Sequence, residues 1–302
     1  MSRRPWVAFA VIAVVILVIA VAAKAAGDKR QEWARSAHAN RELARAQATV
    51  ENRGTTAAHC ARCHSEQGFL AWLPQLEKGN VGFITKPDGS PADIPYLASL
   101  GLTKFSVRPQ TCATCHNPDY SVRVTKITPL LPAGFRALGV GLGAQCMVCH
   151  NTRNGAITWN ADDPRRYTAP HTAAQADVIM GKNAFFVQPS EANISPHASF
   201  IGDSCVTCHV RFGKEGHTFM ASKDVCTRCH GPEMRAQRVQ EGMETLLHEV
   251  EKGMAARVMA ARDRIAVIRN WDPKTGLPDA SMTLPNWLYQ AAPLLKLNFT
   301  PC

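Results

Sequence analysis

Cys205-Val206-Thr207-Cys208-His209 is one of five copies of the pattern C-x-x-C-H that decide how this chain must fold. The other copies are Cys60-Ala61-Arg62-Cys63-His64, Cys112-Ala113-Thr114-Cys115-His116, Cys146-Met147-Val148-Cys149-His150 and Cys226-Thr227-Arg228-Cys229-His230. With 11 Cys and 11 His among 302 residues, random placement would produce roughly 0.01 copies. The pattern uses all but one of the cysteines, so we interpret them as parts of one repeated kind of site.

The spacing within each motif has a chemical reason. Two cysteines three positions apart lie on one face of a helical turn, where their sulfur atoms can form thioethers with the two vinyl groups of one porphyrin. The histidine that follows can then reach the iron as its proximal ligand. Zinc sites and dithiol redox centres also use C-x-x-C pairs, but neither requires a histidine after every pair. We therefore expect five covalently attached c-type haems, with the motif histidines as proximal ligands.

Six further histidines are available as distal ligands: His38, His59, His171, His197, His217 and His248. Histidine is the most common metal ligand, and a core of five irons needs five of these side chains. We expect His38 to project from a helix spanning residues 28–52, and His171, His197 and His217 to act from loops shaped by Pro or Gly.

The fifth distal position has two candidates. His59 directly precedes Cys60, so its ring must point away from the haem attached there and toward a neighbouring one. That placement makes His59 the candidate that we favour. His248 is the alternative ligand, although the simpler interpretation is that it lies on the polar face of a helix. Methionine is not needed as a ligand while six histidines are spare.

The N-terminus carries a membrane signal. Residues 6–23 form an uninterrupted apolar run after Arg3 and Arg4. A cleavable signal has an apolar core of about 7–15 residues and a membrane span needs about 17–25, so we expect a retained transmembrane helix. The arginines would stay inside and the rest of the chain would lie in the periplasm. Small residues around Ala25 offer a cleavage site, so a secreted or cell-surface protein is the alternative.

The formal net charge of +10 would by itself suggest a nucleic-acid partner. Five haems, however, would add about ten negative charges through their propionates at neutral pH. We therefore interpret the basic excess as compensation for the cofactor and expect no nucleic acid as partner.

We expect a mainly α-helical chain with extensive coil and a haem core, divided into three parts. Residues 1–27 are the anchor or signal segment, and residues 28–235 form the haem domain. Residues 236–302 hold an amphipathic helix, with apolar residues every three or four positions from Val239 onward, and a tail that packs on the haem domain. Cys302 belongs to no motif, and we interpret it as a bystander rather than an attachment point or an intermolecular disulfide.

Several runs of sequence resemble multihaem c-type cytochromes of metal-respiring and related bacteria. They are CMVCHNTRNG from residue 146, APHTAAQADVIMG from 169, SPHASFIGDSCVTCH from 195 and GHTF from 216, and the resemblance covers about residues 30–235. It implies helix and coil around closely stacked haems with two histidine ligands each. In that family a histidine after Pro or Gly commonly is a distal ligand, which supports His171, His197 and His217.

The function expected from this resemblance is electron transfer. The haems would relay electrons in a respiratory chain between a quinol-linked donor and periplasmic or outer-membrane acceptor cytochromes. Tetrahaem quinol dehydrogenases share the anchor, but their quinol oxidation is not transferred to this five-motif chain. One alternative is a reductase of a small nitrogen or sulfur oxyanion, with one open haem and with Arg153, Arg165, Arg166 and Tyr167 near it. A further alternative is a subunit of an extracellular haem filament.

Overall fold

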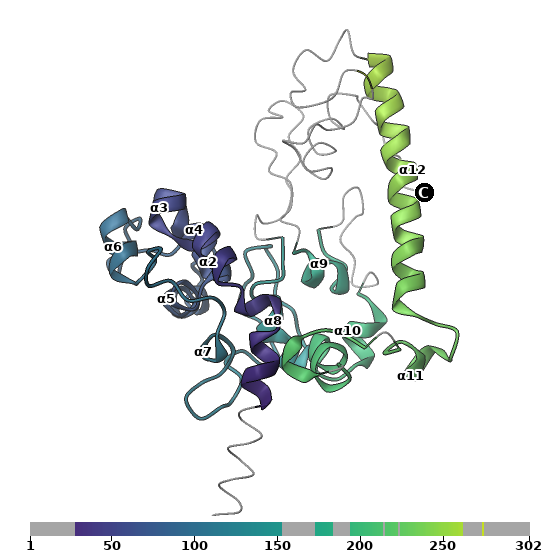
Figure 1. Cartoon of the computed structure of the whole chain (residues 1–302), viewed down its shortest axis with the longest axis horizontal. Coiled ribbons are helices and arrows are strands. Elements are labelled where there is room, and N and C mark those ends of the chain that lie inside the picture. The colour runs from purple at the N-terminus through teal and green to yellow at the C-terminus, as the bar shows by residue number, and fades with distance from the viewer. Residues whose placement is uncertain are drawn as a thin grey trace, which may run out of the picture.

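The computed structural model describes residues 28–152, 173–183, 194–213, 215–222, 224–261 and Lys274. As expected, this part of the chain is mainly helical, with long stretches of coil and little strand (Figure 1). The paired extended residues form isolated bridges, such as His116 with Val122 and Gly213 with Ala221. Short helices and coil thus carry most of the architecture.

The N-terminal segment is not the single helix that the sequence predicted for residues 28–52. Helix covers residues 28–34, and η1 (Ala37–Ala39), α2 (Arg41–Ala48) and α3 (Val50–Arg53) follow it. The breaks fall at Ser36, Asn40 and Thr49, which all have extended backbones. These residue types favour helix N-caps, and the Asn40 side chain accepts a hydrogen bond from the Leu43 amide at 2.9 Å. His38 therefore lies in a short turn between helices.

Residues 41–108 form a first lobe, in which three further helices join α2 and α3: the first packs against α2, the second against the first, and the third against α3. They are α4 (Ala57–His64), α5 (Glu66–Glu77) and α6 (Ile94–Ser99). Its largest fully buried apolar side chains are Trp72, Phe69, Leu76, Ile84, Leu97 and Leu102. Helices α4 and α5 cross closely because residue 68 is glycine; a Cβ there would collide with the backbone of Ala61. This lobe has a core made of its own side chains.

The helices that follow are short. They are α7 (Cys112–Cys115), η3 (Gly141–Gly143), α8 (Ala144–Met147), α9 (Gln175–Ile179), α10 (Pro196–Phe200), the π-helix η6 (Thr207–Arg211), η7 (Gly216–Thr218) and α11 (Thr227–His230). Most have five residues or fewer, so their positions depend on tertiary contacts rather than on helix propensity.

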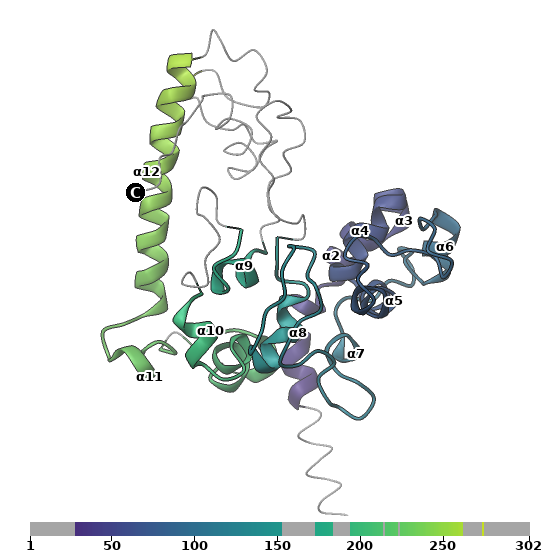
Figure 2. The ribbon, with the colours of Figure 1, turned by 180° about the vertical axis from the view of Figure 1, so that it is seen from behind.

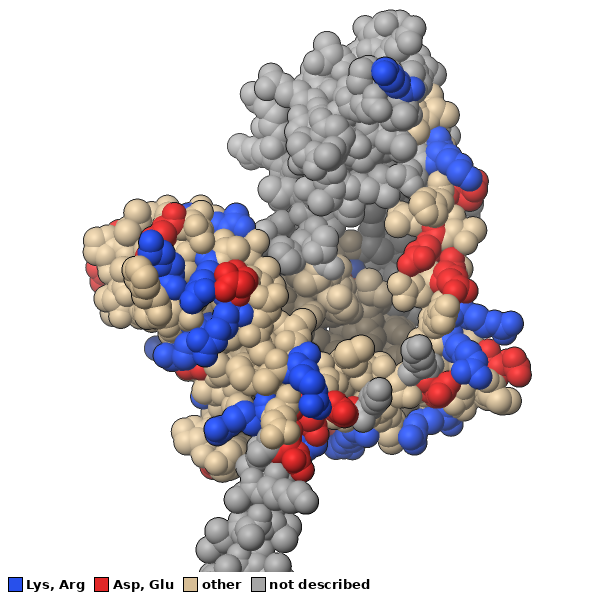
Figure 3. Space-filling model, viewed as in Figure 1, with Lys and Arg blue, Asp and Glu red and all other residues tan. Residues whose placement is uncertain are grey.

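The long helix α12 (Ala236–Ala261) lies on the side of the molecule opposite α3 and α6 (Figures 1 and 2). Its apolar residues Val239, Met243, Leu246 and Leu247 are 47–62% exposed. Lys and Arg side chains alternate with Asp and Glu along it and over the rest of this described face (Figure 3). The charge is therefore interspersed on this side of the molecule.

Among the described residues, no helix combines the length and apolarity that crossing a bilayer requires. The predicted anchor falls in residues 1–27, which lie outside the described residues. The predicted tail after residue 261 also lies outside them, apart from Lys274.

Candidate functional site

The C-x-x-C-H motifs adopt the helical turns that their spacing predicts. His116, His150 and His230 each donate a backbone N–H, at 2.9 Å, to the carbonyl oxygen of the first cysteine of their own motif. The first motif lies within α4, and the fourth enters the π-helix η6. None of the ten motif cysteines is paired in a disulfide. Each turn thus gathers two thiols and one imidazole, as attachment of a porphyrin requires.

The rings of three motif histidines lie opposite three of the histidines predicted as distal ligands. The pairs, with their ring-centroid distances, are His150 with His38 at 6.1 Å, His116 with His217 at 6.4 Å, and His230 with His197 at 5.8 Å. An iron bound by two imidazoles, with metal–nitrogen bonds of about 2.0 Å, would separate the ring centroids by about 6.3 Å. The three pairs therefore have the spacing needed for two axial ligands of one iron.

Hydrogen bonds select the nitrogen that each motif histidine can offer to a metal. The Nδ1 of His116 lies 2.9 Å from the carbonyl oxygen of Tyr120, and that of His209 lies 2.9 Å from the carbonyl oxygen of Phe219. Because a carbonyl only accepts, Nδ1 must donate and Nε2 keeps the lone pair. Such a partner fixes the tautomer and orientation of metal-binding histidines.

Burial favours the neutral form of three of the paired rings, those of His38, His150 and His217. Desolvation lowers the pKa of His38 to about 4, and the neighbouring His150 contributes to the shift. Burial also lowers the pKa values of His150 and His217. Since a neutral imidazole is the form that binds metal, these rings are ready ligands at neutral pH.

The thiols of the third motif contact those of two other motifs. Cys149 hydrogen-bonds with Cys63 of the first motif, and together with burial this contact raises the pKa of Cys149. Cys146 hydrogen-bonds with Cys205 of the fourth motif, which raises the pKa of Cys146. The third motif thus lies directly between the first and the fourth.

The second and fifth motifs complete the cluster. Cys115 of the second motif interacts electrostatically with both thiols of the third. The pKa of Cys115 is raised to about 11, mainly by burial and to a smaller extent by the neighbouring Cys112. Cys208 of the fourth motif interacts with Cys226 and Cys229 of the fifth. The motifs therefore form a branched cluster: the third adjoins the first, second and fourth, and the fifth adjoins the fourth.

Two contacts that the sequence did not predict hold the N-terminal helical segment, residues 28–34, against this cluster. The Trp33 indole donates to the carbonyl oxygen of Gln110 at 2.7 Å, close to the second motif. Glu32 accepts from the backbone N–H of His217 at 2.9 Å, and its carboxylate lies 3.8 Å from His217 Nδ1. This segment therefore braces the His116–His217 pair, although no motif in the sequence marks it.

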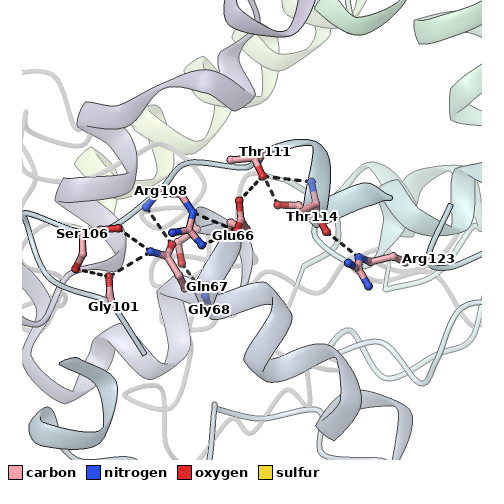
Figure 4. Close-up of polar contacts among 11 residues, drawn as sticks. Glu66, Gln67, Gly68, Gly101, Ser106, Arg108, Thr111, Thr114 and Arg123 are labelled. Carbon is pink, nitrogen blue, oxygen red and sulfur yellow. Dashed lines mark hydrogen bonds and ion pairs between the residues drawn. The ribbon is translucent and has the colours of Figure 1, made fainter. Parts of the chain in front are cut away.

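A buried carboxylate joins the first two motifs (Figure 4). Glu66, two residues after His64, binds the Arg108 guanidinium at 2.6 and 3.1 Å and accepts from the Thr111 hydroxyl. Thr111 and Thr114 form the capping box that begins α7. Burial alone would raise the pKa of Glu66, but the Arg108 and Thr111 hydrogen bonds hold it below its usual value.

The remaining candidates belong to none of the three histidine pairs described above, or lie outside the described residues. The His59 ring packs 5.3 Å from the ring of Phe83 and approaches Arg62 at 3.3 Å. His64 ends α4, and His248 is exposed on α12. Outside the described residues lie His171, Cys302 and the reductase candidates Arg153, Arg165, Arg166 and Tyr167.

Within the described residues, no three His, Cys, Asp or Glu side chains converge where they could hold a metal ion. The imidazoles approach one another in pairs instead. Comparisons of the chain with protein-family models, curated proteins and solved structures found no match.

Proposed function

We propose that this chain binds five c-type haems covalently and relays electrons in a respiratory chain. The observation that carries the proposal is the set of three histidine pairs, 5.8–6.4 Å between ring centroids, each beside its own C-x-x-C-H turn. A porphyrin supplies four ligands to its iron, so two opposed imidazoles complete the coordination. A tetrahedral zinc site would instead need four protein ligands around one point.

Three histidine pairs support ligand assignments at three of the five proposed sites. His150 pairs with His38, His116 with His217, and His230 with His197. We propose that His59 and His171 serve the two remaining motifs, whose own histidines are His64 and His209. The two cysteines of each motif form the thioethers.

When bound, each haem would supply an iron centre that takes up and releases one electron. At the three histidine pairs, two imidazoles would hold one iron and would leave no position for a substrate, so these sites would be limited to electron transfer. The carbonyl oxygens of Tyr120 and Phe219 hold the proximal rings of His116 and His209 in the ligating tautomer. A reductase of a nitrogen or sulfur oxyanion would require one position without a second histidine.

The contacts between motifs support a relay. The Cys63 and Cys149 side chains are neighbours, as are those of Cys146 and Cys205, so the attachment sites of the first, third and fourth motifs adjoin one another. We propose that residues 1–27 anchor this cluster at the periplasmic face of the cytoplasmic membrane. A quinol-linked donor and periplasmic or outer-membrane cytochromes would then be its redox partners.

Intact-mass spectrometry of the purified protein tests the haem proposal. We expect the mass of five haems per chain, with one fewer in a Cys226→Ser/Cys229→Ser variant. Cys302→Ser is the matched control, since Cys302 lies outside the motifs, and it should keep all five. A wild-type chain without covalent haem would contradict the proposal. The same spectrum shows whether residues 1–27 are retained, as the anchor requires.

A further inference from the structure

Phe219 lies where candidate ligands of three motifs meet. Its ring packs edge-on against the His38 ring, 4.6 Å between centroids, and against the His217 ring at 5.8 Å. Its carbonyl oxygen accepts the Nδ1–H of His209 at 2.9 Å. His38 and His217 belong to the third and second sites, and His209 to the fourth. Phe219 therefore contacts candidate ligands of the second, third and fourth sites.

The backbone of Phe219 adopts a conformation that a large side chain disfavours. It has φ 58° and ψ 16°, in the left-handed region, at the end of η7. Glycine would adopt this conformation without strain, whereas a bulky aromatic residue does so only where the surroundings require it. The nearby bridge between Gly213 and Ala221 closes the loop that presents Phe219. This backbone conformation presents the Phe219 ring to the His38 and His217 rings and its carbonyl oxygen to His209.

Tyr120 shares one role of Phe219, the carbonyl that holds a motif histidine, but lacks the other, a ring packed against distal histidines. It also has a positive φ, 65°, and its carbonyl oxygen accepts the Nδ1–H of His116 at 2.9 Å. Its side chain, however, is 86% exposed. The left-handed carbonyl is thus a device shared by the second and fourth motifs, while packing of the ring against distal histidines distinguishes Phe219 from Tyr120.

We propose that Phe219 is a positioning residue that fixes the orientations of the His38 and His217 rings while its carbonyl holds His209. The inference rests on the haem-binding function proposed above. The His38 and His150 rings are nearly perpendicular, at 86°, and the His116 and His217 rings are nearly parallel, at 27°. Phe219 contacts the distal ring of both pairs, so it controls both angles.

The angle between two axial imidazoles has its own spectroscopic signature. In low-spin ferric haem, perpendicular rings give a strongly anisotropic EPR signal with a large maximal g value, and parallel rings give a rhombic one. The wild-type protein should show both kinds. This readout reports ring orientation directly, and a loss of stability alone does not move it.

Phe219→Gly removes the ring and keeps the carbonyl in a conformation that glycine favours. We expect this variant to keep the wild-type number of haems, while its strongly anisotropic signal shifts toward the rhombic form as His38 loses its support. Phe219→Leu should shift the same signal by a smaller amount, and Phe219→Tyr should restore the wild-type spectrum. Phe105→Leu is the control, because Phe105 is 87% exposed.

An unchanged spectrum in both Phe219→Gly and Phe219→Leu would overturn the inference, as would an equal shift in Phe105→Leu. These outcomes leave the haem-binding proposal intact when the wild type carries five haems. A wild type without haem would instead defeat the proposed function itself.

Discussion

Residues 41–108 and residues 194–235 are held together by different means. The first lobe buries Trp72, Phe69, Leu97 and Leu102 completely, and these side chains form a continuous core. Among the described residues of the second segment, Ala198 is the one buried apolar side chain. This segment nevertheless contains two complete motifs and four histidines. The second segment therefore needs a core that side chains do not supply, which is the role we propose for haem.

Preventing haem attachment should have the largest effect on stability, and this effect should be confined to one region of the chain. In a chain made without haem, residues 194–235 would lack the groups around which we propose that they fold, and their amide hydrogens should exchange about 100-fold faster or more. Residues around Trp72 should keep most of their protection. Hydrogen exchange read by mass spectrometry compares the two regions. Equal protection of residues 194–235 with and without haem would contradict the proposal that haem forms the core of this segment.

Trp72→Ala should produce the opposite pattern. Trp72 is fully buried, and the Cζ atom of the Arg62 guanidinium lies over its ring, 4.8 Å from the ring centroid. Its truncation should lower the free energy of unfolding of the first lobe by about 3–5 kcal/mol. Denaturant unfolding followed by circular dichroism measures this loss. Phe105→Ala, at an exposed position, should stay within about 0.5 kcal/mol of the wild type. Equal losses in the two variants would show that Trp72 is not part of a core.

Glu66→Gln should have a smaller, pH-dependent effect. The pKa of Glu66 lies below its ordinary value of 4.5, so its stabilising contribution is present above about pH 4.5 and is lost as pH falls through the folded-state pKa. We expect a loss of about 1–2 kcal/mol at pH 7, since the partner Arg108 is partly exposed.

The pH dependence supplies the test. Unfolding curves of wild type and Glu66→Gln should converge at pH values below the folded-state pKa of Glu66. Glu42→Gln is the control, because Glu42 pairs with Arg45 on the surface and its side chain is 80% exposed. A Glu66→Gln difference that persists unchanged in acid would show that charge is not the cause.

Tyr120→Gly should have the smallest effect. The substitution relieves a positive φ, keeps the carbonyl that holds His116, and removes an exposed ring. We expect the free energy of unfolding to change by less than about 1 kcal/mol, in the stabilising direction. Thermal unfolding measures the change. A large loss of stability would give the Tyr120 ring a role that its exposure does not suggest.

Part of the candidate site could be predicted from residue types and spacing alone. C-x-x-C-H dictates a helical turn, and the structure has such turns. His38, His197 and His217 were predicted as distal ligands and do lie opposite motif histidines. Which motif each one serves was not predictable, because the partners are separated by 33 to 112 residues along the chain.

Other features could not be predicted from the sequence, because they depend on side chains that compete for backbone hydrogen bonds and on tertiary contacts. The predicted single helix over residues 28–52 was wrong because Asn40 caps a new helix and Ser36 and Thr49 are extended. Averaged helix propensity does not register such breaks. The left-handed backbone of Phe219 was not foreseeable either, since phenylalanine rarely adopts it and the loop imposes it.

The spin state of the oxidised protein shows whether every haem iron has two histidine ligands. EPR and optical spectra of the wild type should show only low-spin haem, unchanged by carbon monoxide after reduction. His38→Ala should convert one haem to the high-spin form with five still attached, whereas His248→Ala should leave all low-spin. A high-spin, ligand-binding haem in the wild type would contradict two histidine ligands at every iron. A fully low-spin His38→Ala variant would contradict the role of His38 as a ligand.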